Sequence, residues 1–93
     1  MVELKKKIFR FLFYNYGKRF TFTKIKKNVG EPYRQRLYYW IRYFRRKDWI
    51  RREMDYTLKK KNFKYRYYFN PKIRKKINID YYKKAGWIED DNS

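Results

Sequence analysis

The sequence predicts a single α+β domain, mostly helical, in which a β-hairpin precedes the last helix. Its length of 93 residues suits one compact domain. Apolar side chains recur at helical spacing in segments separated by glycines, and one later segment alternates aromatic and polar residues as a strand does. We expect residues 1–88 to form the domain and the acidic end, 89–93, to fray.

The first predicted helix spans residues 2–16. Leu4, Ile8 and Leu12 fall on one face, and Gly17 is placed to cap the C-terminal end in the left-handed conformation. Further aromatic side chains widen this apolar face, so we expect the helix to pack on two sides. Its second partner is either the C-terminal segment or another subunit.

A short extended segment, residues 18–22, leads to the second helix, 24–29. Thr23 is the predicted N-cap, since its hydroxyl can accept a hydrogen bond from the first turn. Gly30 ends this helix.

The third and longest helix is predicted over residues 32–47. Glu31 suits its positively polarised N-terminal end, and Pro32 suits the first turn. The spacing gives a core-facing stripe of Tyr33, Leu37, Trp40, Ile41 and Phe44. The opposite face carries Gln35, Arg36, Tyr39, Arg42, Tyr43 and Arg46.

A β-hairpin is predicted after this helix. Asp48 breaks the helical pattern, in a place where a left-handed residue is wanted. Residues 49–56 form one strand, the basic segment 57–62 forms the turn, and residues 63–69 alternate in the period of a half-buried strand.

The C-terminal helix begins at Asn70-Pro71, an N-cap followed by a first-turn proline. It carries Ile73 and Ile77, and Asp80 is the predicted cap of a further turn.

Charge points to a polyanionic partner. The chain holds 28 Lys or Arg against 9 Asp or Glu, for a formal charge of +19, and the basic residues are spread along it. Aromatic residues make up 25% of the chain, enough to build a core in spite of the charge. Nucleic acid is the commonest partner for such a surface, and anionic membrane is the next.

The order of elements resembles the winged helix-turn-helix family found in small bacterial, archaeal and archaeal-virus regulators. The resemblance covers about residues 8–77 and lies in TKIKKNVGEPYRQRLYYWIRYFRRKDWI and KKKNFKYRYYFNP. Its matching positions are Thr23, Ile25, Val29, Gly30, Leu37, Ile41, Phe44, Asp48 and Ile50. The family often has Gly where this chain has Asp48 and Asn62, which bears on the wing geometry.

The resemblance implies sequence-specific binding to double-stranded DNA, with helix 32–47 in the major groove and the lysine-rich hairpin on the backbone or minor groove. The candidates for base readout are Arg34, Gln35, Arg36, Tyr38 and Tyr39. The candidates for phosphate contact are Lys24, Lys26, Lys27, Arg42, Arg46, Lys59, Lys60, Lys61, Asn62 and Lys64.

Other functions remain as alternatives. One alternative is an RNA-binding protein whose Tyr and Arg stack on unpaired bases. Another is an architectural protein that coats DNA without sequence preference. Membrane binding is the weakest of these, because basic and aromatic residues occur on several elements rather than one amphipathic helix.

An enzyme is not expected. The chain has no His and no Cys, which removes their acid–base, thiol and zinc chemistry. Glu53 and Asp55 share one side of a predicted strand, but such a pair beside a basic hairpin is more typical of local charge balance than of a metal site. We therefore expect no cofactor and no metal, and no small-molecule ligand is evident from the sequence.

Location and assembly follow from the same observations. The lack of Cys favours the cytoplasm of a cell, or of a host cell for a viral protein. We expect a homodimer, formed through the apolar face of residues 4–16 and the set Ile73, Ile77, Tyr81 and Tyr82, as terminal helices commonly do in winged-helix regulators.

Overall fold

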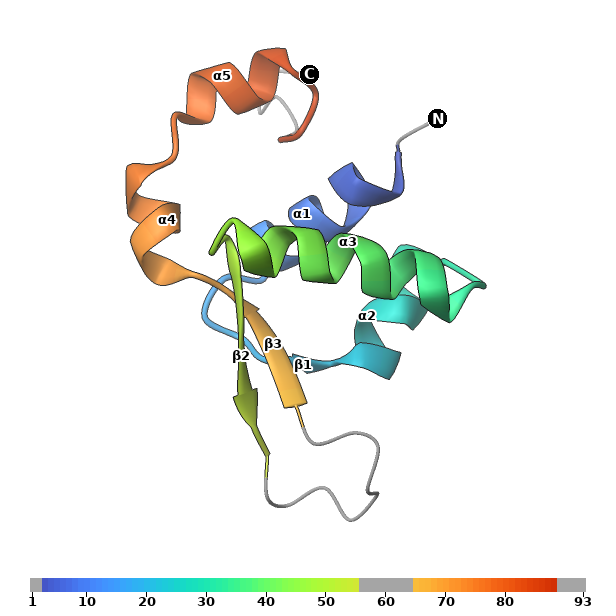
Figure 1. Ribbon diagram of the computed structural model, residues 1–93. Helices are drawn as coiled ribbons and strands as arrows, with labels where there is room; N and C mark the ends of the chain where they lie inside the picture. The colour runs from blue at the N-terminus through green and yellow to red at the C-terminus, as the bar shows by residue number, and fades with distance from the viewer. Residues whose placement is uncertain (1–2, 56–64, 89–93) are drawn as a thin grey trace.

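A computed structural model describes residues 3–55 and 65–88, which form an α+β domain of helices around a three-stranded antiparallel sheet (Figure 1). The α+β class is therefore confirmed. The C-terminal region contains two short helices where the sequence predicted one helix and a further turn. The elements are α1 (Leu4–Tyr14), β1 (Phe20–Thr21), α2 (Phe22–Val29), α3 (Arg34–Arg46), β2 (Ile50–Met54), β3 (Tyr65–Phe69), α4 (Pro71–Lys76) and α5 (Ile79–Lys84).

The sheet has the strand order β1-β3-β2, so β3 is its central strand and β2 an edge strand. The predicted hairpin is confirmed, since β2 and β3 pair antiparallel with Ile50 opposite Phe69. The two-residue strand β1 adds to the other side of β3, with Phe20 opposite Tyr67. The turn predicted over 57–62 lies outside the described residues.

The core lies between α1, α2, α3 and the inner face of the sheet. Phe9 is 1% exposed, and its ring contacts those of Phe44, Trp49 and Phe69 at centroid distances of 5.3–6.3 Å. The other buried apolar residues are Ile8, Leu12, Phe13, Phe22, Ile25, Val29, Leu37, Ile41, Phe44, Ile50, Tyr67, Phe69 and Ile88. Aromatic side chains thus build much of the core, as the composition predicted.

The C-terminal segment covers α1. The ring of Phe9 stacks on Tyr82 at 5.5 Å and meets Trp87 edge-on at 5.2 Å. Arg10 donates hydrogen bonds from Nε to the Trp87 carbonyl and from Nη2 to the Gly86 carbonyl, at 3.1 and 2.7 Å. Of the two partners expected for α1, the structure provides the C-terminal segment.

Two of the predicted N-caps are wrong. The N-cap of α2 is Thr21, whose hydroxyl accepts a hydrogen bond from the Lys24 N–H, because burial of Phe22 extends the helix toward its N-terminus beyond Thr23. The N-cap of α5 is Asn78, and Asp80 lies in the first turn.

Helix α3 begins at Arg34 and ends at Arg46, within the predicted span of 32–47. Its start is later because Glu31 turns back and its carboxylate accepts a hydrogen bond from the Tyr33 N–H, which keeps this stretch non-helical. Tyr33 consequently precedes the helix and is 63% exposed, so its place in the core stripe was wrong. Trp40 is half-buried beside that stripe.

Other turn residues behave as predicted. Gly30 ends α2 in the left-handed conformation, and Asp48 adopts a φ of 62° after α3. Asn70 caps α4, with Pro71 in its first turn. Gly17 is left-handed too, but its predicted role as the cap of α1 is wrong, because the helix ends at Tyr14 and its C-cap is Asn15. None of the helices within residues 3–55 and 65–88 has the length and apolar character that a membrane span requires.

Candidate nucleic-acid interface

The outer side of α3 is polar, aromatic and basic. Leu37, Ile41 and Phe44 hold one side of the helix in the core, and this fixes which side chains are left outside it. The positions spaced by one, two and three turns from Arg34 share one stripe of the helix. That stripe consists of Arg34, Tyr38, Arg42 and Arg45.

A hollow of about 450 Å³ lies where α3 meets the hairpin. In Figure 1, β2 begins where α3 ends, and the hairpin runs away from the helix. The hollow is lined by Tyr38, Arg42, Arg45, Arg46 and Arg52. A second hollow, of about 330 Å³, follows the edge of β2 and shares Arg45 and Arg52 with the first. We call Arg42, Arg45, Arg46 and Arg52 the arginine cluster.

Strand β2 brings Arg52 to α3. Arg52 pairs with Tyr67 in the register of the sheet, so it lies on the same sheet face as the buried Ile50. Its guanidinium stacks over the ring of Tyr65, with the Cζ atom 4.0 Å from the ring centroid. Because β2 is an edge strand that continues past the core, this inner-face arginine stays accessible beside the helix.

Acidic side chains neutralise other arginines but not this cluster. Glu31, Asp48, Glu53 and Asp55 approach Arg36, Arg51, Arg19 and Arg66, respectively. Within residues 3–55 and 65–88, no acidic side chain lies within ion-pair distance of the arginine cluster. Four like charges are thus held together without a counter-charge from the described part of the chain.

The pair of Asp48 and Arg51 marks the boundary of the cluster. Both carboxylate oxygens of Asp48 accept hydrogen bonds from the Arg51 guanidinium at 3.0 Å. These bonds lower the pKa of Asp48 and raise the pKa of Arg51. Arg51 lies on the opposite sheet face from Arg52. Arg51, which is neutralised, and Arg52, which has no acidic partner among the described residues, therefore lie on opposite faces of β2.

The predicted base-readout residues divide between two sides of α3. Arg34 and Tyr38 lie on the stripe that leads to the hollow, and both approach Phe22 of α2. Gln35 is exposed, and Tyr39 is 62% exposed. Arg36 is about 200° around the helix from Arg34. Its Nη1 lies 3.9 Å from the Glu31 carboxylate, so Arg36 belongs to the paired arginines.

The predicted phosphate contacts are only partly described. Arg42 and Arg46 belong to the arginine cluster. On α2, Lys24 and Lys27 are exposed and Lys26 is half-buried. The hairpin residues Lys59, Lys60, Lys61, Asn62 and Lys64 lie outside the described residues.

Sequence reasoning missed Arg45 and Arg52. Arg45 follows Arg42 by three residues, so helical spacing alone was sufficient to include it. Arg52 required the pairing register of β2 with β3, because the position of an arginine in a strand does not reveal which face meets a distant helix. Tertiary contact thus brings together two residues that no local pattern connects.

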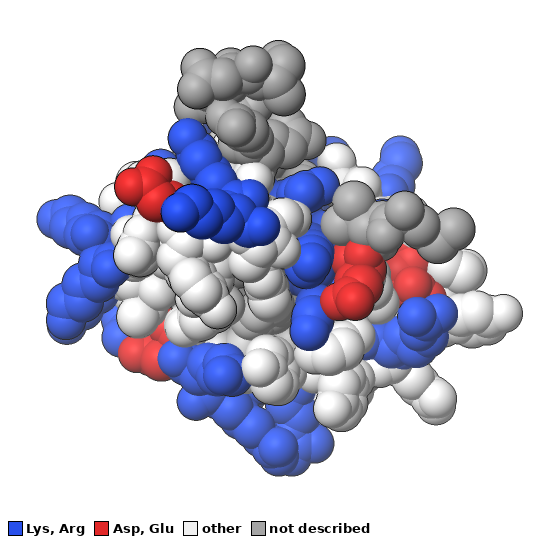
Figure 2. All heavy atoms as spheres, turned by 90° about the horizontal axis from the view of Figure 1, so that it is seen from above, with Lys and Arg blue, Asp and Glu red and all other residues white. Residues whose placement is uncertain are grey.

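Basic side chains are not restricted to this site. On the face seen in Figure 2, Lys and Arg lie around much of the outline, and acidic side chains appear in a few places. What distinguishes the arginine cluster is its concave shape and its lack of acidic partners among the described residues. The part of the chain that the structure describes contains no group of three or more Asp or Glu placed to hold a metal ion.

Comparison of the chain with protein-family models, with curated proteins and with solved structures found no match. The function is therefore inferred from this chain's own residues.

Proposed function

We propose that this protein binds double-stranded DNA as a winged helix-turn-helix domain. Helix α3 is the recognition helix and enters the major groove, and the β2–β3 hairpin is the wing that follows the backbone. The observation that carries the proposal is the arginine cluster, in which four guanidinium groups line one hollow with no acidic partner among the described residues.

Phosphate groups suit this cluster. A guanidinium presents N–H groups in a planar fork that matches two phosphate oxygens, and its charge is permanent at physiological pH. The cluster then supplies affinity, because neutralising each phosphate releases condensed counterions.

Base readout is the task of the exposed residues near the start of α3. Arg34, Gln35 and Tyr39 are the principal candidates, because Arg hydrogen-bonds guanine and Gln hydrogen-bonds adenine in the major groove. Arg36 is a weaker candidate, since its approach to Glu31 competes with contact to a base. A role in transcription regulation, in the cytoplasm, is the corresponding biological proposal.

Titration of a labelled DNA duplex at several salt concentrations tests the binding proposal. We expect the variant R45Q/R52Q to bind more weakly. We also expect the slope of log K against log salt concentration to become less steep by about 2, because each neutralised phosphate contributes about −0.9 to it. The control K75Q/K76Q removes the same charge from exposed positions of α4. If both variants weaken binding equally, binding depends only on the net charge of the protein, and the cluster has no specific role.

Selection of bound sequences from a random duplex pool tests specificity. Enrichment of a defined site supports a sequence-specific regulator. If no sequence is enriched while the salt dependence stays steep, the protein is an architectural DNA-binding protein instead.

RNA binding is the second candidate, and the exposed tyrosines favour it. Tyr33 and Tyr39 are 63% and 62% exposed on the side of the molecule where α3 begins, and such rings can stack on unpaired bases. Parallel titrations with duplex DNA and with single-stranded RNA separate the two functions. If the protein binds RNA as tightly as DNA or more tightly, and if Y39A weakens that RNA binding, the protein is an RNA-binding protein and the DNA proposal is wrong.

The homodimer is also proposed, on a smaller surface than the sequence suggested. The C-terminal segment covers much of α1, and the apolar side chains left exposed there are Tyr14, Tyr16, Ile79 and Tyr81. These lie on α1, its following turn and α5. Measurement of the molecular mass in solution, with and without duplex DNA, tests this. A monomeric mass under both conditions would contradict it.

A further inference from the structure

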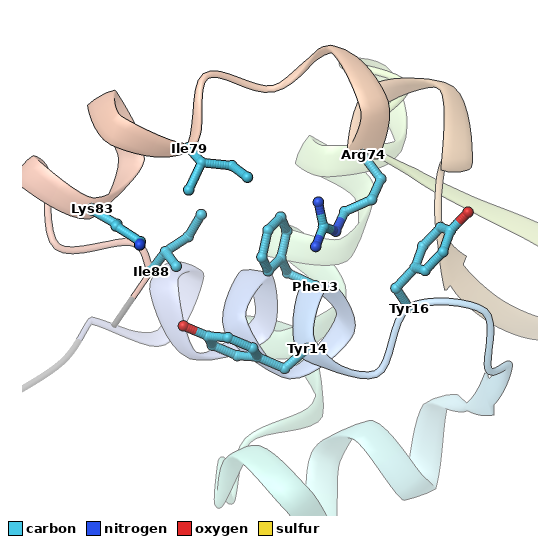
Figure 3. A pocket seen from close by; sticks show the side chains of 7 residues that line it. All are labelled: Phe13, Tyr14, Tyr16, Arg74, Ile79, Lys83 and Ile88. Atoms are coloured by element: carbon cyan, nitrogen blue, oxygen red, sulfur yellow. The ribbon is translucent and has the colours of Figure 1, made fainter. Parts of the chain in front are cut away.

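A second cavity lies on α1, away from the arginine cluster. It has a volume of about 400 Å³ and shares no lining residue with the hollows beside α3. Its size is within the range of small-molecule sites, about 300–1,000 Å³. Figure 3 shows its side chains coming from α1, the turn after it, α4, α5 and the C-terminal segment.

The walls of this cavity combine apolar and polar surface. Phe13, Ile79 and Ile88 contribute aromatic and aliphatic surface, and two tyrosines complete one side. The two charged residues that line it are both cations, Arg74 and Lys83. A cavity with apolar walls on one part, cationic groups on another and no acidic lining residue among the described residues is complementary to an anion with an apolar body.

Arg74 is held by stacking on aromatic rings, and no acidic side chain among the described residues forms an ion pair with it. Its Cζ atom lies 4.1 Å from the centroid of Phe13 and 5.8 Å from that of Tyr16, and Figure 3 shows the guanidinium between the two rings. Its Nε is buried and has no hydrogen-bond partner among the described residues. A buried donor without a partner is costly, so a conformation that gives it an acceptor is favoured.

We propose that this cavity binds a small organic carboxylate with an apolar body. The carboxylate accepts hydrogen bonds from the Arg74 guanidinium, which turns slightly to present Nε and one terminal nitrogen as a fork. The apolar body packs on Phe13, Ile79 and Ile88. Because these residues join α1 to α4 and α5, the bound ligand also links the C-terminal segment to the core.

Three probes separate the parts of this proposal. Hexanoate carries both the charge and the apolar body, hexan-1-ol carries the body alone, and inorganic phosphate carries charge alone. Binding is followed in two-dimensional ¹H–¹⁵N NMR spectra, including the Arg Nε–H signals. We expect saturable shifts for hexanoate at the cavity residues and at Arg74, with much weaker binding of the other two probes.

The variants R74Q and K72Q provide the matched test. Both remove one charge from α4, but Lys72 does not line the cavity. We expect R74Q to weaken hexanoate binding at least tenfold, R74K to weaken it less, and K72Q to leave it unchanged. The same spectra report whether each variant is folded.

Several results would overturn the proposal. They are the absence of a saturable shift with hexanoate, equal binding of hexan-1-ol, and unchanged affinity in R74Q. If hexanoate binds only after deletion of residues 89–93, the chain's own acidic end is the occupant and the free ligand is excluded. None of these results affects the DNA titration, because the two sites share no residues.

Discussion

Asn70 is a buried polar side chain whose nitrogen and oxygen both have hydrogen-bond partners. It is 1% exposed, its Nδ2 donates to the Asp48 carbonyl at 2.7 Å, and its Oδ1 accepts from the Lys72 N–H at 3.0 Å. One residue thus caps α4 and ties the end of β3 to the left-handed turn after α3. The sequence predicted the cap, but the contact with Asp48 joins residues 22 positions apart.

We expect N70A to lower the free energy of unfolding by about 1–3 kcal/mol, because the Asp48 carbonyl loses its donor and α4 loses its cap. Urea unfolding followed by tryptophan fluorescence measures this. N78A is the control, because Asn78 caps α5 at an exposed position through a single bond. Equal stability of N70A and the wild type would contradict the role given to Asn70.

Asp48 combines a left-handed backbone with an ion pair. Its φ of 62° suits Asn as well as Asp, so D48N keeps the backbone conformation but removes the charge and one of the two oxygens that accept from Arg51. The hydrogen bonds from Arg51 lower the pKa of Asp48 in the folded state. Its contribution to stability is therefore present above the unfolded pKa, about 3.9, and is lost as pH falls through the folded value.

We expect the wild type to melt at a higher temperature than D48N at pH 7, and the difference to disappear as the pH falls below the lowered pKa of Asp48 in the folded state. Thermal unfolding by circular dichroism at a series of pH values measures this. The effect is small, because both side chains are exposed. A difference that grows toward acid pH would show that the ion pair is not its cause.

At the scale of elements, the start of α2 shows how burial moves a helix boundary. Thr21 and Thr23 are both acceptable N-caps by residue type. The structure selects Thr21, because a helix that starts at Phe22 places this side chain in the core with Ile25 and Val29. Local preference offers the alternatives, and the core decides between them.

Substitution of the two threonines tests this assignment. We expect T21A to lower the free energy of unfolding by about 1 kcal/mol, since the Lys24 N–H loses its acceptor. T23A is the matched control and should change stability little, because Thr23 is exposed. T21S, which keeps the hydroxyl, should restore most of the stability. If T23A were the more damaging variant, the N-cap would be Thr23 after all.

Helix α3 shows how much of the candidate site the sequence could predict. Spacing alone identified its buried and outward sides, and the core confirms Leu37, Ile41 and Phe44. Helical spacing does not show which exposed residues of α3 face the hairpin and which face Glu31. That division between Arg34 and Arg36 depends on how the elements pack.

For the whole molecule, the charge of +19 sets a balance between binding and stability. Like charges repel one another in a compact fold, and salt screens them over about 10 Å at 0.1 M. A surface that suits a polyanion therefore destabilises the fold when the polyanion is absent. The arginine cluster is a local case, since its four guanidinium groups line one hollow.

We expect the melting temperature to rise when NaCl is raised from about 0.05 to about 0.5 M, because screening relieves this repulsion. R45Q/R52Q should be more stable than the wild type at low salt and should respond less to added salt. K75Q/K76Q is the control for net charge and should gain less. A melting temperature that falls with salt would show that attractive ion pairs outweigh the repulsion.

The sequence by itself determined the α+β class, the order of elements, the apolar stripe of α3, the hairpin and the basic character of the surface. These follow from periodicity, turn residues and composition, which act over a few residues along the chain. The tertiary structure decided that α2 starts at Phe22 and α3 at Arg34. It also decided that Trp87 packs on α1 and that Arg45 and Arg52 line the same hollow. These depend on burial and strand register between distant segments, which no local pattern encodes.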